Sequence, residues 1–285
     1  MIPKEYYYFD SDSATSELAT SIRNYGIAVI QKFVSGQKLN ALREESLSIL
    51  KTSLNMHRLG DCEVVKLSVD KVNNIIDGTS IKEETSTIKD VFNRNLVKDL
   101  SADFFGNNPH HMGEIFIHHD KIRNDYTNEW HFDKYAPALK FFIYLTNTTS
   151  ENGAFNFNIG SHREGHFRQM LQNYQGVFPW DKIPNFIPET EVLNPTSIEA
   201  GEGSLIIFNT NGIHRGGVLG KNKERLVIRG HMMYQPTLLD KVIDYLLRSP
   251  LNIAKYCVHS SSKINFKHSS ENYSVPNQKQ DKTFE

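Results

Sequence analysis

The sequence predicts a mainly β protein with flanking helices, in which an antiparallel sandwich or barrel follows a helical N-terminal part. Apolar residues recur at helical spacing in several segments before residue 110. From about residue 112, short runs rich in β-branched and aromatic residues alternate with turn residues. Helices followed by many short strands are typical of this class of fold.

Four elements are expected in the N-terminal part, the helical support over residues 1–110. They are a helix over residues 14–26, a strand over 27–34, a helix over 35–54 and a helix over 88–106. Gly26 and Gly106 stand where glycine commonly ends a helix. Ser35 stands at the expected N-cap of the second helix. Residues 55–90 are mixed and polar, and their pattern leaves their organisation open.

The β core is expected over about residues 110–235. Its strands are expected at residues 113–119, 138–146, 153–160, 204–210 and 225–234. An insert rich in aromatic residues and prolines, residues 163–190, is typical of a lid or binding loop. A helix is expected over 236–250, and the polar segment 261–285 is expected to be a flexible tail. Residues 1–260 are therefore expected to form a single domain.

The composition indicates a soluble protein with a sizeable core. Apolar residues make up 39% of the 285 residues, and 32 basic residues balance 33 acidic ones. This balance gives no support to a nucleic-acid or membrane-surface role. Cys62 and Cys257 are too few for a disulfide scaffold and lack metal-type spacing. With no signal pattern near Met1, we expect a cytoplasmic protein that acts on a small molecule, with no nucleic-acid or membrane partner. Its oligomeric state is left open.

The stretch "EWHFDKY", residues 129–135, introduces the candidate site. His131 and Asp133 are two positions apart, so on a strand their side chains point to the same face. An imidazole and a carboxylate form a mixed nitrogen and oxygen pair that suits a first-row divalent ion. Two ligands hold such an ion weakly, so a neighbouring strand has to supply a third. Taken alone, the pair could instead cap the end of a strand or form a hydrogen bond on the surface.

His214 is the third ligand that the context favours among the 12 histidines. It ends "AGEGSLIIFNTNGIH", a glycine turn followed by a buried strand. The other histidines near the pair are His110, His111, His118, His119, His162 and His166. Two histidines and one carboxylate leave one side of a metal open, which is the arrangement of non-haem Fe(II) oxygenases.

Arg225 follows His214 after ten intervening residues rich in turn formers. A hairpin there would return Arg225 to the side of His214, where a guanidinium could form a bidentate pair with a small organic acid. Arg229 lies on the same strand face but about 13 Å further along, so it is the second choice. The alternative interpretation is that Arg225 is an exposed arginine of the hairpin and has no functional role.

Together, these residues resemble the phytanoyl-CoA dioxygenase-like branch of the Fe(II)/2-oxoglutarate-dependent oxygenases. The segments that match are "WHFD", "LKFFIYLTNTTSENGAFNFNIGSH", "EAGEGSLIIFNTNGIHRGG" and "ERLVIRGHMMY". The resemblance covers about residues 110–235 well and residues 15–35 weakly. It implies a double-stranded β-helix, which is a cupin-like jelly roll with helical support.

The resemblance also implies the cofactors and the roles of the site residues. His131, Asp133 and His214 would ligate Fe(II). Arg225 would hold the distal carboxylate of the cosubstrate 2-oxoglutarate, and Phe142 and Tyr144, which share a strand face with Lys140, would flank it. The implied reaction uses O2, releases succinate and CO2, and hydroxylates an unactivated C–H bond of a small metabolite or biosynthetic intermediate.

The type of oxidation depends on Asp133. Halogenating relatives replace this carboxylate by a small residue that leaves room for chloride, so the resemblance favours a hydroxylase. Some relatives also place a hydroxyl residue at the positions that Gly216 and Val227 occupy here, so the cosubstrate would have fewer partners. Two other functions are kept open: a non-catalytic jelly-roll module that retains a metal site, and another cupin-type metalloenzyme, which would not need Arg225.

Overall fold

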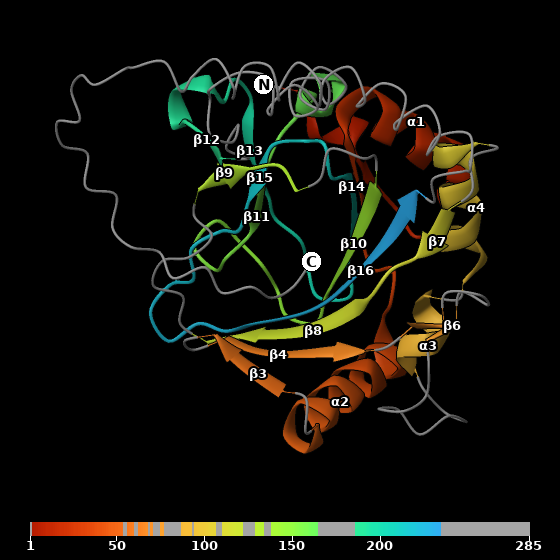
Figure 1. The fold of residues 1–285 in the computed structure, drawn as a ribbon, viewed down its shortest axis with the longest axis vertical. Helices are drawn as coiled ribbons and strands as arrows, with labels where there is room; N and C mark the ends of the chain where they lie inside the picture. Colours follow the sequence, from red (N-terminus) through yellow and green to blue (C-terminus); the bar gives the residue numbers. More distant parts are fainter. Residues whose placement is uncertain are drawn as a thin grey trace, which may run out of the picture.

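Two mainly antiparallel sheets face each other, with helices on the outer face of the larger one (Figure 1). The computed structural model describes residues 2–53, 56–59, 62–67, 69–70, 75–76, 87–92, 94–106, 110–121, 129–133, 138–164 and 186–234. The expected helix over 236–250, the tail 261–285 and most of the insert 163–190 lie outside these residues. Within them, no helix combines the length and apolar character needed to cross a membrane.

The large sheet has nine strands in the order β1-β2-β14-β10-β16-β8-β4-β3, with β7 beside β16. Its strands are β1 (Tyr8–Phe9), β2 (Ile27–Ile30), β3 (Met56–Leu59), β4 (Cys62–Leu67), β7 (His110–Met112), β8 (Ile115–Asp120), β10 (Ala138–Tyr144), β14 (Leu205–Asn209) and β16 (Arg225–Tyr234). β1 and β2 are parallel, and the other neighbours are antiparallel.

The small sheet has five strands in the order β12-β9-β15-β11-β13. They are β9 (Trp130–His131), β11 (Phe155–Asn158), β12 (Phe186–Ile187), β13 (Pro195–Ile198) and β15 (His214–Arg215). A separate pair joins β5 (Val69–Asp70) to β6 (Ile75–Ile76). The helices are α1 (Thr15–Tyr25), α2 (Gly36–Thr52), α3 (Thr87–Phe92) and α4 (Asn95–Phe105), with 3-10 turns at Lys4–Tyr6, Ser161–Glu164 and Glu189–Glu191.

Side chains of β10 alternate between two cores. Leu139, Phe141 and Ile143 belong to the core between the large sheet and the helices. Phe142 and Tyr144 belong to the second core, with residues of the small sheet. This alternation follows from the period of two residues in a strand, and it gives the inner face of the large sheet to the site. The arrangement is the predicted double-stranded β-helix with flanking helices.

The first helix and strand form as predicted. Leu18, Ala19 and Ile22 form the buried stripe of α1. Gly26 ends the helix in the left-handed region with φ of +85°, and its N–H donates to the carbonyl of Ile22 at 2.9 Å. A side chain there would also collide with His162, so both the turn and the packing require glycine.

One prediction for the N-terminal part is wrong. The single helix over 88–106 is two helices, because Arg94 is extended (φ −60°, ψ 144°) at the start of α4. Arg94 donates to the carbonyl of Phe33 at 3.0 Å and lies over its ring, a distant contact that outweighs local helical preference. Residues 55–90 also contain elements, since β4 pairs with β8 along its whole length and extends the large sheet.

Candidate metal centre and its cavity

The two predicted histidines are direct neighbours in the small sheet. His131 ends β9, His214 begins β15, and the two residues pair antiparallel. Their ring centroids lie 4.5 Å apart. Asp133 follows β9 closely and is fixed by its backbone N–H, which donates to the carbonyl of Thr210 at 3.2 Å. Two segments distant in sequence thus bring three side chains together at the paired ends of β9 and β15.

The three side chains form a group that could hold a metal ion, with all ligand atoms within 4.8 Å of one another. The Nε2 atom of His131 lies 3.8 Å from Asp133 Oδ1, and the Nε2 atom of His214 lies 3.5 Å from Asp133 Oδ2. First-row ions bind such ligands at about 2.1 Å, which separates neighbouring ligand atoms by about 3 Å. The residues therefore fit a divalent ion of this kind.

Hydrogen bonds on the far side of each ring orient the imidazoles. His131 Nδ1 lies 3.0 Å from the carbonyl of Glu129, and His214 Nδ1 lies 2.9 Å from the carbonyl of Gly212. Because a carbonyl only accepts, each Nδ1 carries the hydrogen in a neutral ring, and the lone pair of each Nε2 faces Asp133. Backbone carbonyls fix metal-binding histidines in this way in many metalloproteins.

The protonation of the group also suits a metal. Burial and the neighbouring His214 lower the pKa of His131 to about 4, so its ring is neutral near pH 7. Burial alone would raise the pKa of Asp133, but Lys140 and His214 outweigh it and hold that pKa well below its usual range. These two ligands are already deprotonated at neutral pH, so a metal displaces no proton from them.

Replacing His131 by asparagine tests this shift. His131 titrates near pH 6.5 in the unfolded chain and near pH 4 in the folded protein. Between these two pH values, the unfolded state therefore binds more protons than the folded state. Stability of the metal-free protein therefore falls as the pH drops through this window, by about 2 kcal/mol at pH 5 from His131 alone. Urea unfolding at about pH 7 and pH 5 should show a weaker pH dependence for His131→Asn. An equal pH dependence would contradict the shift.

Asp133 forms part of the wall of a cavity of about 590 Å³. Most of its charged or titratable lining residues are basic: His57, Lys66, His111, His118, Lys140, Arg229 and His231, against the acidic Glu114 and Asp133. Lys140 Nζ forms an ion pair with Asp133 Oδ2 at 2.7 Å, and Lys66 forms one with Glu114. With the histidines counted as neutral, three cations face two carboxylates, and the one excess positive charge favours an anionic occupant beside the candidate metal centre.

A comparison with protein families gives the relationship of the chain. The family model described as HalD, Halogenase D, matches residues 10–159, more than half of the chain. The chain belongs to the Halogenase D family. The stretch that matches this family includes His131 and Asp133 and ends before His214 and Arg225. A comparison with curated proteins gave no match.

Solved structures that resemble this Halogenase D family member give its fold. The epimerase SnoN, described in complex with Fe3+, alpha ketoglutarate and nogalamycin RO, has a TM-score of 0.56 and 14% identity, over 78% of this chain and 86% of that one. The carbocyclase SnoK from nogalamycin biosynthesis has a TM-score of 0.57 and 13% identity, over 82% and 92%. HygX from Streptomyces hygroscopicus, with nickel and 2-oxoglutarate bound, has a TM-score of 0.54 and 13% identity, over 79% and 89%. The fold is thus the one that these three proteins share.

Phe142 and Tyr144, the predicted neighbours of the cosubstrate, lie on the inner face of β10. Phe142 packs against the rings of Phe155 and Phe208, and both of those contact the ring of His214. Tyr144 is fully buried, and burial raises its pKa. Phe142 therefore supports the candidate centre through an aromatic cluster, and its contact with a cosubstrate stays a prediction.

Arg225 lies at the start of β16 in a buried ion pair. Its Nε and Nη2 atoms donate to Asp120 Oδ2 at 2.9 Å and 2.6 Å, and Nη1 donates to the carbonyl of Gly153. These bonds use three of the five N–H groups of a guanidinium. Arg225 does not line the cavity, whereas Arg229 does and stacks over the ring of Phe142 at 4.9 Å. In this Halogenase D family member, both arginines thus stay candidates for the carboxylate.

A second group with metal-ligating side chains contains Cys62, which the sequence spacing did not indicate. Cys62, His118 and Asp120 come from the paired strands β4 and β8, and their ligand atoms lie within 4.8 Å of one another. Asp120 is fully buried and already holds Arg225. A cation added there would face the guanidinium, so we interpret this group as the surroundings of Arg225.

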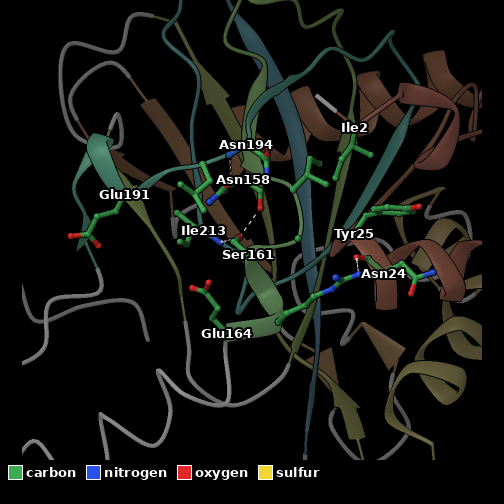
Figure 2. Close-up of a pocket in the computed structure, with 13 residues that line it drawn as sticks. Ile2, Asn24, Tyr25, Asn158, Ser161, Glu164, Glu191, Asn194 and Ile213 are labelled. Atoms are coloured by element: carbon green, nitrogen blue, oxygen red, sulfur yellow. Dashed lines mark hydrogen bonds between the residues drawn. The ribbon is translucent and has the colours of Figure 1, made fainter.

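A polar network holds the chain just before His214, at Ile213 (Figure 2). Ser161 Oγ accepts a bond from the backbone N–H of Ile213 at 2.7 Å and donates to the carbonyl of Asn158 at 2.6 Å. Asn158 Oδ1 accepts from the N–H of Asn194 at 2.8 Å. These residues line a separate pocket of about 360 Å³, where they satisfy one another and fix the residue before the ligand. The sequence offered no local signal for this role of Ser161.

Proposed function

We propose that this protein is an Fe(II)- and 2-oxoglutarate-dependent dioxygenase that hydroxylates an unactivated C–H bond of a small molecule. The observation that carries the proposal is the group of His131, Asp133 and His214, with both Nε2 atoms aimed at the carboxylate. The shared fold of SnoN, SnoK and HygX supports the choice of cofactor and cosubstrate.

Membership of the Halogenase D family makes halogenation the second candidate. Asp133 argues against it, because its carboxylate stands where halogenating relatives leave room for chloride. The carboxylate is also held in place by Lys140 at 2.7 Å and by its backbone bond to Thr210. Hydroxylation is therefore the outcome we propose.

Each residue has a role in the proposed reaction. His131, Asp133 and His214 would hold the iron, which with 2-oxoglutarate and O2 supplies the oxidation of a C–H bond with release of succinate and CO2. Arg225 would bind the distal carboxylate of 2-oxoglutarate through its remaining N–H groups, beside Tyr144, while Asp120 keeps the guanidinium in position. The basic cavity next to Asp133 would take the substrate, and Arg229 in its wall is the alternative anchor.

The purified protein should show the cofactor chemistry directly. Fe(II) and 2-oxoglutarate, added without oxygen, should give a weak visible metal-to-ligand band. Admitting oxygen to a metabolite mixture should then release succinate together with a product heavier by one oxygen atom, even when chloride is present. Absence of both the band and succinate would refute the oxygenase proposal. A chlorinated product in place of the hydroxylated one would refute only the hydroxylase part.

A further inference from the structure

Lys140 is the one cation in direct ion-pair contact with the candidate metal ligands among the residues that the structure describes. It lies on the inner face of β10, opposite His231 of β16 and Phe208 of β14. Its Nζ atom is 2.7 Å from Asp133 Oδ2, and its side chain is 30% exposed toward the cavity. Its position is therefore set by a central strand of the large sheet, whereas Asp133 extends from the small sheet.

We propose that Lys140 is a positioning residue that restricts Asp133 to binding the metal through one oxygen atom and balances the charge of the loaded site. This inference rests on the proposed function. An ammonium group that holds Oδ2 leaves Oδ1 as the oxygen better able to bind an ion. A carboxylate that binds through one oxygen leaves one more position on the metal open than a carboxylate that binds through both.

The charges support the same role. A divalent ion, one carboxylate and the doubly charged 2-oxoglutarate leave one negative charge over. Uncompensated charge is costly in a site as buried as this one, where His214 is 4% exposed. The ammonium of Lys140 removes that excess, because Asp120 already balances the charge of Arg225. It also repels a bare divalent ion, so it opposes metal binding alone and favours binding of metal and cosubstrate together.

A matched pair of variants tests the inference on the full chain. Lys140→Met removes the ammonium and keeps the unbranched side chain up to the ε position. Lys66→Met is the control, because Lys66 lines the same cavity, is similarly exposed and is paired with Glu114 in place of a metal ligand. Co(II) serves as the metal probe, and its binding, its visible spectrum and the affinity of the Co(II)-loaded protein for 2-oxoglutarate are measured without oxygen.

For Lys140→Met we expect Co(II) to bind several-fold more tightly and 2-oxoglutarate to bind about tenfold more weakly, as expected for one nearby charge. The Co(II) spectrum should shift as Asp133 gains a second bond to the metal. Lys140→Arg and Lys66→Met should behave like the wild type. If Lys140→Met does not fold, Lys140→Gln serves in its place.

Opposite changes in the two affinities distinguish the role from general destabilisation, which would weaken both. If both affinities fall together, or if Lys140→Met matches Lys66→Met, the inference is wrong. A wild-type protein that binds neither Co(II) nor 2-oxoglutarate would instead refute the proposed function itself.

Discussion

Asp133→Gly should abolish hydroxylation and weaken Fe(II) binding by more than about 100-fold. Loss of a residue that only hydrogen-bonds to a metal ligand already lowers metal affinity by about 10–100-fold, and Asp133 is a ligand itself. The variant loses one of three ligands, and the two imidazoles of His131 and His214 remain oriented by their carbonyl partners. It also leaves the ammonium of Lys140 without its partner at 2.7 Å, beside the space that the carboxylate filled. That space has the size and charge to suit a small anion.

Chloride should therefore restore part of the Fe(II) affinity in Asp133→Gly but not in the wild type. The measurement is an anaerobic Fe(II) titration with and without chloride, followed by mass spectrometry of the products. Glu114→Gln removes another carboxylate from the same cavity and should leave metal affinity unchanged. Hydroxylation that survives in Asp133→Gly would exclude Asp133 as a ligand.

Arg225→Met should destabilise the fold by about 3–5 kcal/mol, because it leaves the carboxylate of Asp120 buried without its cation. Asp120 is 0% exposed and Arg225 is 2% exposed, so water cannot replace the lost partner. Replacing both residues by apolar ones, as in Asp120→Leu with Arg225→Met, should recover most of the loss. Urea unfolding of the single and double variants measures the difference. A single variant as stable as the wild type would contradict the importance of this ion pair.

The folded double variant then identifies the anchor of the cosubstrate. If Arg225 binds 2-oxoglutarate, the double variant should lose most of its affinity, whereas Arg229→Met should keep it. The reverse result would transfer the role to Arg229, which lines the cavity and stacks on Phe142. Binding is measured by the visible band of the Fe(II) complex, so no substrate is needed.

The sequence was informative where function depends on local periodicity. The spacing of His131 and Asp133 predicts a common face, and a glycine turn followed by a buried strand singles out His214. The three meet as expected, although β9 and β15 are only two residues long each. The same periodicity places Lys140, Phe142 and Tyr144 on one face of β10, and the inner core of the structure contains the two aromatic residues.

What could not be predicted depends on partners distant in the chain. Asp120 is one of 33 acidic residues, and nothing near it indicates the bond to Arg225, 105 positions away. The break between α3 and α4 depends on the contact of Arg94 with Phe33. Strand β4 has a mixed pattern because Glu63 and Lys66, three positions apart, interrupt its buried residues without the alternation of a strand. Only its pairing with β8 defines it as part of the sheet.

The alternation along β10 also bears on how this family can diverge. Odd-numbered positions, Leu139, Phe141 and Ile143, face the helices and maintain the fold. Even-numbered positions, Lys140 and Phe142 among them, face the cavity or the rings around His214. Substitutions at the odd positions are therefore expected to act on stability, and those at the even positions on the site and on the second core, within the same seven-residue strand. We expect members of this family that differ in substrate to differ at the even positions more often than at the odd ones.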